Sequence, residues 1–357
     1  MPVTPNSAPV ARRGALAVSA ALAALIALSG CTAPTADGSK TGDSSGSALL
    51  PAAEGATEYP LTLETPYGAS VLEERPERIA VIGGLGDQES VLSLDIAPVV
   101  GSDEGIYLWN EGTRIDEIGE FVDPWADSLA FEALLAAEPD LIVASTYGKL
   151  EDDFERLSSI APVLAVAPTG DYSWDWRELV LSVGEATDLA SLAEAEVAET
   201  EQLVARAAEA HPEYDGRTVG IIINRGQEAG IQFVNTAGSP AEQLLDRLGF
   251  GTHPKLDELS AFEWGDVSIE NIALVDADAL VVARHGGNGT VEEATAWLEG
   301  NGLYQQLGAV ERGKVSYIDP NPETGGLDLA WAFAYPNVLA NRWAVEELTG
   351  AFDGLFD

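Results

Sequence analysis

The feature that most constrains the fold of this chain is an internal repeat. Residues 129–145 align without a gap on residues 267–283, and apolar positions mostly coincide. Each stretch has the pattern of a helix followed by a buried strand. A chain that carries this unit twice is expected to form two similar lobes with a cleft between them. The matched pairs include Glu132 with Glu270, Asp140 with Asp278, and Val143 with Val281.

Short β-branched runs alternate with helical segments through the body of the chain. Each run is bounded by Gly, Pro, Asp or Asn, and apolar residues recur at helical spacing between the runs. This alternation predicts an α/β fold with parallel sheets covered by helices on both faces. The predicted strands are 79–82, 98–100, 141–144, 162–166, 218–223, 231–234, 279–283 and 315–318, and the predicted helices include 88–94, 131–137, 240–248 and 291–298.

A long segment between the two halves, 185–211, is rich in Ala, Glu and Leu, contains no Gly or Pro, and precedes Pro212. A helix over this segment would be about 40 Å long at 1.5 Å per residue. We interpret it as a rigid helix that joins the lobes and permits little domain closure; the alternative is a long surface helix. The predicted boundaries are an N-terminal lobe over 58–184, a connecting helix over 185–212 and a C-terminal lobe over 213–357.

The first 31 residues have the pattern of an export signal. Arg12 and Arg13 precede an apolar run over 15–28, which is short for a membrane-spanning helix. The run ends in Leu-Ser-Gly-Cys, which resembles a bacterial lipobox and contains the only cysteine of the chain, Cys31. We predict a lipoprotein signal peptide over 1–30, lipidation of Cys31, and a flexible polar tether over 31–57. The protein is then anchored at the extracytoplasmic face of the bacterial membrane; the alternative is an unlipidated signal peptide.

The chain is strongly acidic, with 59 Asp and Glu against 18 Lys and Arg and a formal net charge of −41. A surface of this charge repels phosphate backbones, which argues against nucleic acid as a partner. An anionic ligand would need local positive groups. Because basic residues are scarce, each arginine near a predicted strand end is informative.

Five sequence landmarks occur in order within residues 60–350. They are RPERIAVI (75–82), FEALLAAEPDLIV (131–143), LSSIAPV (157–163), VSIE (267–270) and LGAVERGKV (307–315). With the lipobox and the long helix, this order resembles the solute-binding lipoproteins of bacterial ABC importers, and the ferric-siderophore branch fits best. The resemblance implies a class III solute-binding fold that captures a ferric siderophore in the interlobe cleft and delivers it to an ABC permease. Cobalamin or haem is the alternative cargo.

Two glutamates are candidates for docking on the permease. In proteins that this chain resembles, a glutamate at the outer tip of each lobe pairs with permease arginines, and Glu132 and Glu270 occupy those motif positions. Two separated carboxylates on one face would fix the orientation of docking. The alternative is a local role, in which each glutamate favours the N-terminus of its own helix. The candidate caps of these helices are Asp127, Ser128, Asp266 and Ser268.

Aromatic and basic side chains gather just after the predicted strands, where ligands of open α/β sheets bind. Such walls suit a large anion such as a ferric siderophore. Arg225 and Arg284 directly end buried strands and are the strongest candidates; their alternative is a local ion pair, with Glu228 or another carboxylate. For each aromatic residue the alternative is core packing. The predicted ligand-binding residues are Tyr107, Trp109, Tyr147, Trp174, Arg225, Arg284, His285 and Trp331.

The sequence does not have the pattern of an enzyme or of a bare-metal carrier. The three histidines, His211, His253 and His285, all lie outside the first lobe. Carriers of bare zinc or manganese need several His and carboxylate ligands, so chelated iron is the predicted cargo, with no cofactor and no protein metal site. Walker A and His-Glu-x-x-His motifs are absent. The alternative from another class is a lipid-anchored extracellular hydrolase. We expect a monomer.

Overall fold

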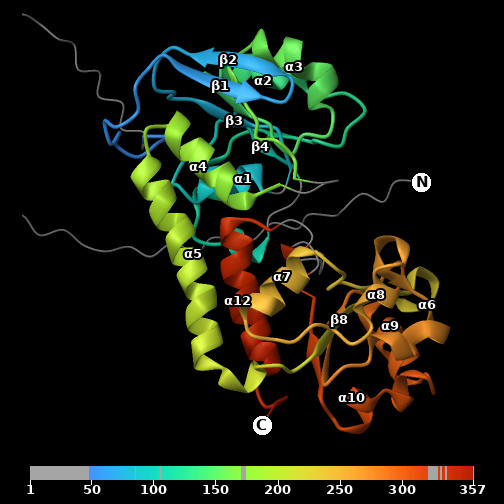
Figure 1. Cartoon of the computed structure of the whole chain (residues 1–357). Helices are drawn as coiled ribbons and strands as arrows, with labels where there is room; N and C mark the ends of the chain where they lie inside the picture. Colours follow the sequence, from blue (N-terminus) through green and yellow to red (C-terminus); the bar gives the residue numbers. More distant parts are fainter. Residues whose placement is uncertain are drawn as a thin grey trace, which may run out of the picture. The chain divides into compact units, whose positions relative to one another are not determined.

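The computed structural model describes residues 48–84, 86–103, 107–169, 174–320, 329, 332–333 and 336–356. All of them belong to the second of the two compact units of the chain, Ser47–Asp357. Within this unit, one set of sheets is built from elements that precede α4 and another from elements that follow α5 (Figure 1). In this described part, no helix is long and apolar enough to cross a membrane.

The N-terminal lobe is built on a parallel sheet of order β3-β6-β7. All residues of these three strands are buried, as is typical of strands covered on both faces. A bridge between Ala80 and Val100 joins β3 to the chain just before β4. The strand predicted over 98–100 is observed over Gly101–Ser102, slightly later in the chain. The strands are β1 (Leu61–Thr65), β2 (Gly68–Leu72), β3 (Ile79–Val81), β4 (Gly101–Ser102), β5 (Phe121–Val122), β6 (Leu141–Val143) and β7 (Val163–Leu164).

The helix α3 is amphipathic and packs its apolar face against the strands of this lobe. In α3, Leu150, Phe154 and Leu157 are buried at helical spacing, while Glu151, Asp152 and Asp153 form an acidic first turn, which favours the N-terminus of a helix. The helices are α1 (Asp87–Leu92), η1 (Leu108–Asn110), η2 (Arg114–Glu117), α2 (Phe131–Ala137), α3 (Leu150–Ser158) and α4 (Trp176–Ala186).

The segment between the lobes forms two helices where one was predicted over 185–212. Residues 185–186 close α4, and α5 (Ala190–Ala210), with 21 residues, begins after a bend. Asp188 has φ 56° in this bend. Its carboxylate accepts hydrogen bonds from the backbone N–H of Gly55, Ala56 and Thr57 at 2.7, 2.8 and 2.9 Å, and these bonds hold the pKa of Asp188 below its ordinary value. The bend is therefore fixed by the chain at residues 55–57.

Residues 48–57, which the sequence assigns to the tether, pack on the N-terminal lobe. Leu50 is 8% exposed and belongs to the core of this lobe. Arg75 donates from Nη2 to the carbonyl oxygen of Pro51 at 2.8 Å and from Nε to that of Thr187 at 2.7 Å. Cys31 and the rest of the predicted tether lie outside the described residues.

The C-terminal lobe contains a five-stranded sheet of order β10-β9-β8-β11-β12. Strands β8, β11 and β12 are parallel, but β9 runs antiparallel to β8 and β10. The four-residue helix α6 is the only element between β8 and β9, and a parallel crossover needs a longer connection. The α/β prediction is confirmed, with this antiparallel edge as a departure. The strands are β8 (Val219–Asn224), β9 (Ile231–Phe233), β10 (Asp266–Val267), β11 (Ala279–Arg284) and β12 (Val315–Ile318).

The last helix, α12, lies beside α5 (Figure 1). Its buried face joins the C-terminal core, where the ring of Tyr214 stacks on Phe250 at 4.6 Å and meets Phe352 edge-on at 5.5 Å. The helices of this half are η3 (Pro212–Tyr214), α6 (Gly226–Ala229), α7 (Pro240–Arg247), α8 (Leu256–Leu259), η4 (Glu263–Gly265), η5 (Ile269–Val275), α9 (Val291–Glu299), η6 (Tyr304–Gln306), α10 (Gly308–Glu311) and α12 (Val338–Phe352).

The internal repeat corresponds to the same construction in both lobes. Asp140, before β6, accepts hydrogen bonds from the backbone N–H of Glu77 and Arg78, both at 2.8 Å, at the start of β3. Asp278, before β11, accepts from the N–H and hydroxyl of Thr218 at 3.0 and 3.1 Å, at the start of β8. Each repeated aspartate thus joins its own strand to the first strand of its lobe.

Candidate ligand-binding site

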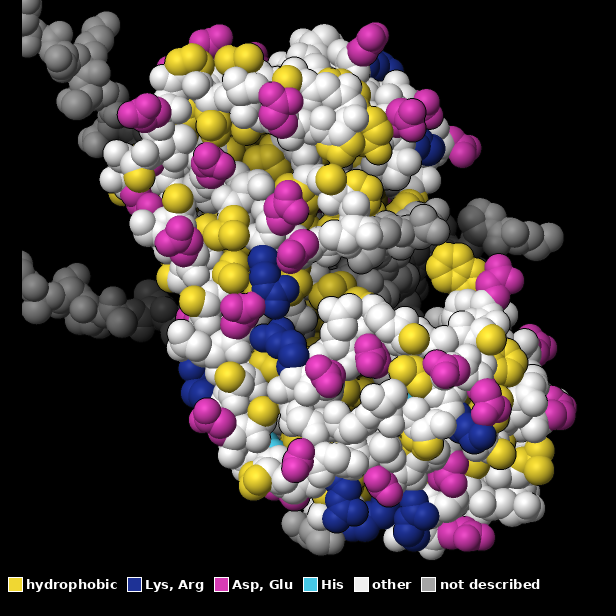
Figure 2. All heavy atoms as spheres, viewed as in Figure 1, with side chains coloured by type: hydrophobic (Ala, Val, Ile, Leu, Met, Phe, Trp, Pro, Cys, Tyr) yellow, Lys and Arg dark blue, Asp and Glu magenta, His cyan; other side chains and the backbone are white. Residues whose placement is uncertain are grey.

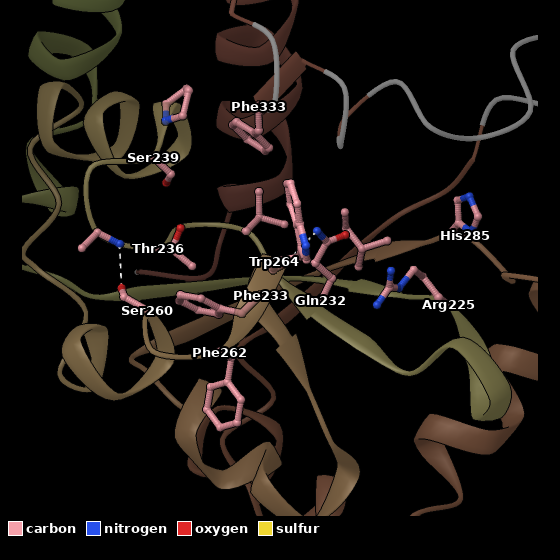
Figure 3. Close-up of a pocket in the computed structure, with 15 residues that line it drawn as sticks. Arg225, Gln232, Phe233, Thr236, Ser239, Ser260, Phe262, Trp264, His285 and Phe333 are labelled. Atoms are coloured by element: carbon pink, nitrogen blue, oxygen red, sulfur yellow. Dashed lines mark hydrogen bonds between the residues drawn. The ribbon is translucent and has the colours of Figure 1, made fainter. Parts of the chain in front are cut away.

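A cavity of about 600 Å³ opens at the carboxyl end of β8 in the C-terminal lobe (Figure 3). This edge is where open α/β sheets bind ligands, and the volume is in the usual range for small-molecule sites. Arg225 and His285 lie together at one end, and Ser239 and Ser260 lie at the other. Aromatic walls are formed by Phe233, Phe262, Trp264 and Phe333.

Arg225 is held at the cavity by the backbone of a buried strand, because it directly follows β8. Its side chain is 25% exposed, and Nη2 forms an ion pair with Asp266 on β10. The local ion pair that was the alternative for Arg225 is therefore present, and its partner is Asp266 and not Glu228. The Nε–H is buried without an acceptor among the described residues. Since a guanidinium has five N–H donors, Arg225 keeps donors for an anionic ligand.

His285 lines the same end of the cavity and directly follows β11, the strand next to β8. Its Nδ1 accepts a hydrogen bond from the N–H of Gly287 at 3.0 Å, so the proton of the neutral ring lies on Nε2. Burial, and then the charge of Arg225, lower the pKa of His285. The neutral imidazole therefore contributes one N–H donor beside the guanidinium.

Trp264 was not among the predicted ligand residues, yet it lines the cavity and is 69% exposed. Its φ of 56° is uncommon for a residue other than glycine. Its carbonyl oxygen accepts from Nε2 of Gln232 at 2.9 Å, and a Cβ at the next residue, Gly265, would lie 2.2 Å from the carbonyl oxygen of Phe233. These contacts fix the loop and leave the indole free to stack on a ligand. The only signal in the sequence was an aromatic residue before a glycine.

Arg284 does not line this cavity. Its Nη1 pairs with Asp319 at 2.8 Å, and its guanidinium lies 4.4 Å from the ring centroid of Tyr317. The local ion pair, which was the alternative for this residue, is therefore present. Arg284 ends β11 and contacts Tyr317 of the neighbouring strand β12. It therefore serves as a control for Arg225, which follows β8 and lines the cavity.

Three predicted aromatic residues of the N-terminal lobe are buried in cores. Tyr107 and Trp109 are 6% and 5% exposed and stack on each other at 4.5 Å, and Trp109 also contacts Trp343 of α12. Tyr147 is 3% exposed and donates its hydroxyl to Asp153 at 2.7 Å. In the described structure these residues belong to hydrophobic clusters of buried side chains. None of the three lines the cavity.

The remaining two predicted aromatic residues have different positions. Trp174 is half-buried and lines a separate pocket, near α7. Trp331 lies outside the described residues. Of the seven predicted ligand residues that the structure describes, Arg225 and His285 line the 600 Å³ cavity.

Two buried carboxylates lie at the matching end of the N-terminal sheet. Asp87 and Glu89, in the first turn of α1, are 0% and 1% exposed. Asp87 Oδ2 accepts from the N–H and hydroxyl of Thr146 at 2.8 and 2.9 Å, and Glu89 Oε1 accepts from Trp109 Nε1 at 3.2 Å and Asn110 Nδ2 at 3.3 Å. Burial raises the pKa of Asp87 to about 6. Because this pKa lies below 7, Asp87 is mainly ionised at neutral pH and repels anions from this sheet end.

Glu132 and Glu270 are exposed and occupy the second positions of α2 and η5. Neither has an ion-pair partner in the described part of the chain. The N-cap residues, Ala130 and Ser268, make no side-chain cap hydrogen bond. The predicted caps are therefore wrong, except that Ser268 has the N-cap position. Both carboxylates remain available to a partner.

No group of three or more His, Cys, Asp or Glu side chains that could hold a metal ion occurs among the described residues. The basic cavity end suits an anionic ligand better than a bare cation.

Two repeated α/β lobes, an intervening long helix and a cavity at the strand ends define a class III solute-binding fold. A family model described as "Periplasmic binding protein" matches residues 124–322. The chain belongs to this family of extracytoplasmic binding proteins, which confirms the resemblance seen in the sequence.

The similarity to individual proteins covers more of the chain than the family model does. The ferric-anguibactin-binding protein FatB of Vibrio anguillarum is 23% identical over 325 residues, which cover 82% of this chain and 87% of that protein. A periplasmic solute binding protein from Mycobacterium smegmatis has a TM-score of 0.68 and 18% identity over 83% of this chain and 98% of that one. PiaA of Streptococcus pneumoniae, solved in complex with ferrichrome, has a TM-score of 0.59 and 25% identity over 82% and 98%.

Proposed function

We propose that this protein binds a ferric siderophore in the cleft between its lobes and delivers it to an ABC permease without chemical change. The observation that carries the proposal is the cavity at the end of β8, where Arg225 and the Nε2–H of His285 face aromatic walls. The guanidinium attracts carboxylate, catecholate or hydroxamate oxygens. The rings, with Trp264 exposed among them, pack on the apolar parts of the ligand.

The named ligands of similar proteins support this choice of cargo. FatB is named for ferric anguibactin, and PiaA was solved with ferrichrome. SirA of Staphylococcus aureus, with a TM-score of 0.60 and 19% identity, was solved with staphyloferrin B. These three ligands differ chemically, and the titration described below determines which siderophore class this protein binds.

Delivery needs an anchor and a docking surface. In our proposal, Cys31 carries lipid and keeps the protein, as a monomer, at the extracytoplasmic face of the membrane. Glu132 and Glu270 then pair with arginines of the permease, one for each lobe. Their exposure and their lack of ion-pair partners among the described residues support this role. Two such contacts fix the orientation of the protein on the permease.

The test is a titration of the chain that follows Cys31 with ferric siderophores of hydroxamate, catecholate and carboxylate type, and with haem and cobalamin. The chain has eight tryptophans, so an iron chelate bound beside Trp264 should quench its fluorescence. Saturable quenching by one siderophore class is the expected result. A response to haem or cobalamin alone would replace the cargo, and no response to any ligand would overturn the proposal.

The same titration separates a binding protein from a hydrolase. A binding protein releases its ligand unchanged after denaturation, whereas an enzyme returns a product. Mass spectrometry of the released ligand after prolonged incubation should show only the intact siderophore. A cleaved ligand would favour the extracellular hydrolase.

A further inference from the structure

A second pocket, of about 250 Å³, lies where segments of both lobes meet beside α7. It shares only Pro240 with the 600 Å³ cavity, and it is small for a siderophore, since drug-sized ligands occupy about 300–1,000 Å³. The N-terminal lobe contributes Trp174, Asp175 and Arg177, and the C-terminal half contributes Gln243, Arg247 and Asn341.

Two guanidinium groups line this pocket, although the chain has a net charge of −41. Arg177 pairs through Nε with Glu201 at 2.6 Å. Arg247 has no carboxylate partner among the described residues, and burial, then the charge of Arg177, lower its pKa. Basic side chains also gather near the junction of the lobes in the space-filling view, among scattered acidic ones (Figure 2). An anion between the two guanidinium groups would relieve their repulsion.

Neutral donors complete the pocket. The indole N–H of Trp174 is buried and has no hydrogen-bond partner in the described part of the chain, which is unfavourable for a polar group. The side-chain amide of Asn341 has no partner within the described residues. Gln243, in contrast, already donates to the carbonyl oxygen of Gly238 at 2.9 Å. Side chains with unused donors, one from each lobe, therefore line the pocket together with the two cations.

We propose that this pocket binds a small carboxylate anion that bridges the two lobes through Arg177 and Arg247. A carboxylate has the planar pair of oxygens that a guanidinium fork binds. Asp175 and Glu201 offset the charge of the two arginines, so a monoanion is favoured over a phosphate dianion. The site is independent of the siderophore cavity, and the loss of siderophore binding would not affect it.

Acetate is the probe, and the indole N–H resonances of ¹⁵N-labelled protein are the readout. The Trp174 resonance is assigned by its absence from Trp174→Phe. Sodium acetate replaces sodium chloride at constant ionic strength, so general salt effects are cancelled. We expect a saturable shift of the Trp174 resonance and a rise in Tm with acetate, because a ligand that binds only the folded state stabilises it.

Arg247→Gln should weaken acetate binding by at least about tenfold, which corresponds to about 1.4 kcal/mol. Arg206→Gln is the matched control, since Arg206 is exposed on α5 outside the pocket, and it should bind acetate as the parent does. Arg247→Lys, which retains the charge but loses the fork, should be intermediate and also serves if Arg247→Gln does not fold. The proposal is overturned if acetate gives no saturable shift, if Arg247→Gln binds it unchanged, or if phosphate binds more tightly than acetate.

Discussion

The two lobes share a scaffold, but the carboxyl ends of their sheets are used differently. In the C-terminal lobe this edge is an open cavity with Arg225, His285 and the exposed Trp264. In the N-terminal lobe the matching edge contains two buried carboxylates, Asp87 and Glu89, whose oxygens accept hydrogen bonds from residues of the same lobe. One sheet end therefore places polar side chains along an open cavity, and the other buries them within the fold.

The comparison teaches that a repeat preserves the construction of a lobe without preserving a site. The aspartates Asp140 and Asp278 make equivalent bonds to the first strand of each lobe. The residues after the strands have no such equivalence, because loops vary more than the elements that they connect. We therefore expect substitutions to act alike at repeated positions and differently at strand ends.

The largest effect should come from repeated positions outside the ligand site, in the double variant Glu132→Ala, Glu270→Ala. Both side chains are exposed and lie outside the cavity, so siderophore affinity and Tm should stay unchanged. Uptake by cells should fall to the level of a strain without the protein, because docking would lose both of its charge contacts. Iron-55 uptake and a parallel titration measure the two quantities.

Single variants sharpen this prediction. If the lobes dock equivalently, Glu132→Ala and Glu270→Ala should reduce uptake by similar factors. Glu151→Ala, at an exposed position in the first turn of α3, is the control and should leave uptake intact. Loss of ligand binding in the double variant would show that these carboxylates serve the site instead of the permease.

The next largest effect should be at the open sheet end, in Arg225→Gln. Removal of a charged donor that contacts an anionic ligand should weaken binding by roughly a hundredfold, or about 3 kcal/mol. Arg284→Gln is the matched control, because Arg284 ends the neighbouring strand but pairs with Asp319 outside the cavity. Its affinity should change by less than about threefold.

Asp266 complicates the Arg225 variant, since its carboxylate would lose its partner and repel the ligand. The double variant Arg225→Gln, Asp266→Asn removes that repulsion and isolates the guanidinium contact. If the double variant binds as tightly as the parent, Arg225 is a structural partner of β10 and not a ligand residue.

Much of the scaffold could be predicted because local rules are sufficient there. The helix at Phe131–Ala137 and the strand at Val315–Ile318 have the predicted bounds, since apolar periodicity and flanking turn residues agree. The bend between α4 and α5 could not be predicted, because its cause is a set of hydrogen bonds from residues 55–57 to Asp188, more than a hundred residues away.

The site was harder to predict than the scaffold. Arg225 was identifiable because it directly ends a buried strand. Trp109 has the same local signal, an aromatic residue after a strand, but the indole of Trp343 and the carboxylate of Glu89 enclose it. Trp264 had no such signal, since its exposure depends on a left-handed backbone held by Gln232. Whether an aromatic residue lines a site or a core is therefore decided by distant packing.

A smaller effect, on stability, should come from the closed sheet end. Asp87 has a pKa of about 6 in the folded protein, above the ordinary 3.8, so the folded state binds its proton more tightly than the unfolded state does. Stability from this group is therefore gained as pH falls from about 6 toward 4 and is absent at pH 7, where the buried charge costs on the order of 3 kcal/mol.

The variant Asp87→Asn should remove this pH dependence. The amide oxygen can keep the bonds from Thr146, and the NH₂ group takes the place of Oδ1, which has no hydrogen-bond partner among the described residues. In urea unfolding at pH 4, 5, 6 and 7, the free energy of unfolding of the variant should exceed that of the parent at pH 7 and equal it near pH 4. Asp215→Asn, at an exposed position, is the control, and an unchanged parent-minus-variant difference across this range would contradict the assignment.

The smallest effect should be a loss of stability that is equal in the two lobes, at the repeated aspartates. Asp140→Ala and Asp278→Ala should each lower the free energy of unfolding by about 1.5 kcal/mol, because each removes two charge-assisted hydrogen bonds that are partly exposed. Asp215→Ala should cost less than about 0.5 kcal/mol. Equal losses at Asp140 and Asp278 would support an equivalent scaffold in the two lobes. A loss confined to one lobe would contradict this equivalence, since the two copies of the repeat would then be similar in sequence but would contribute differently to stability.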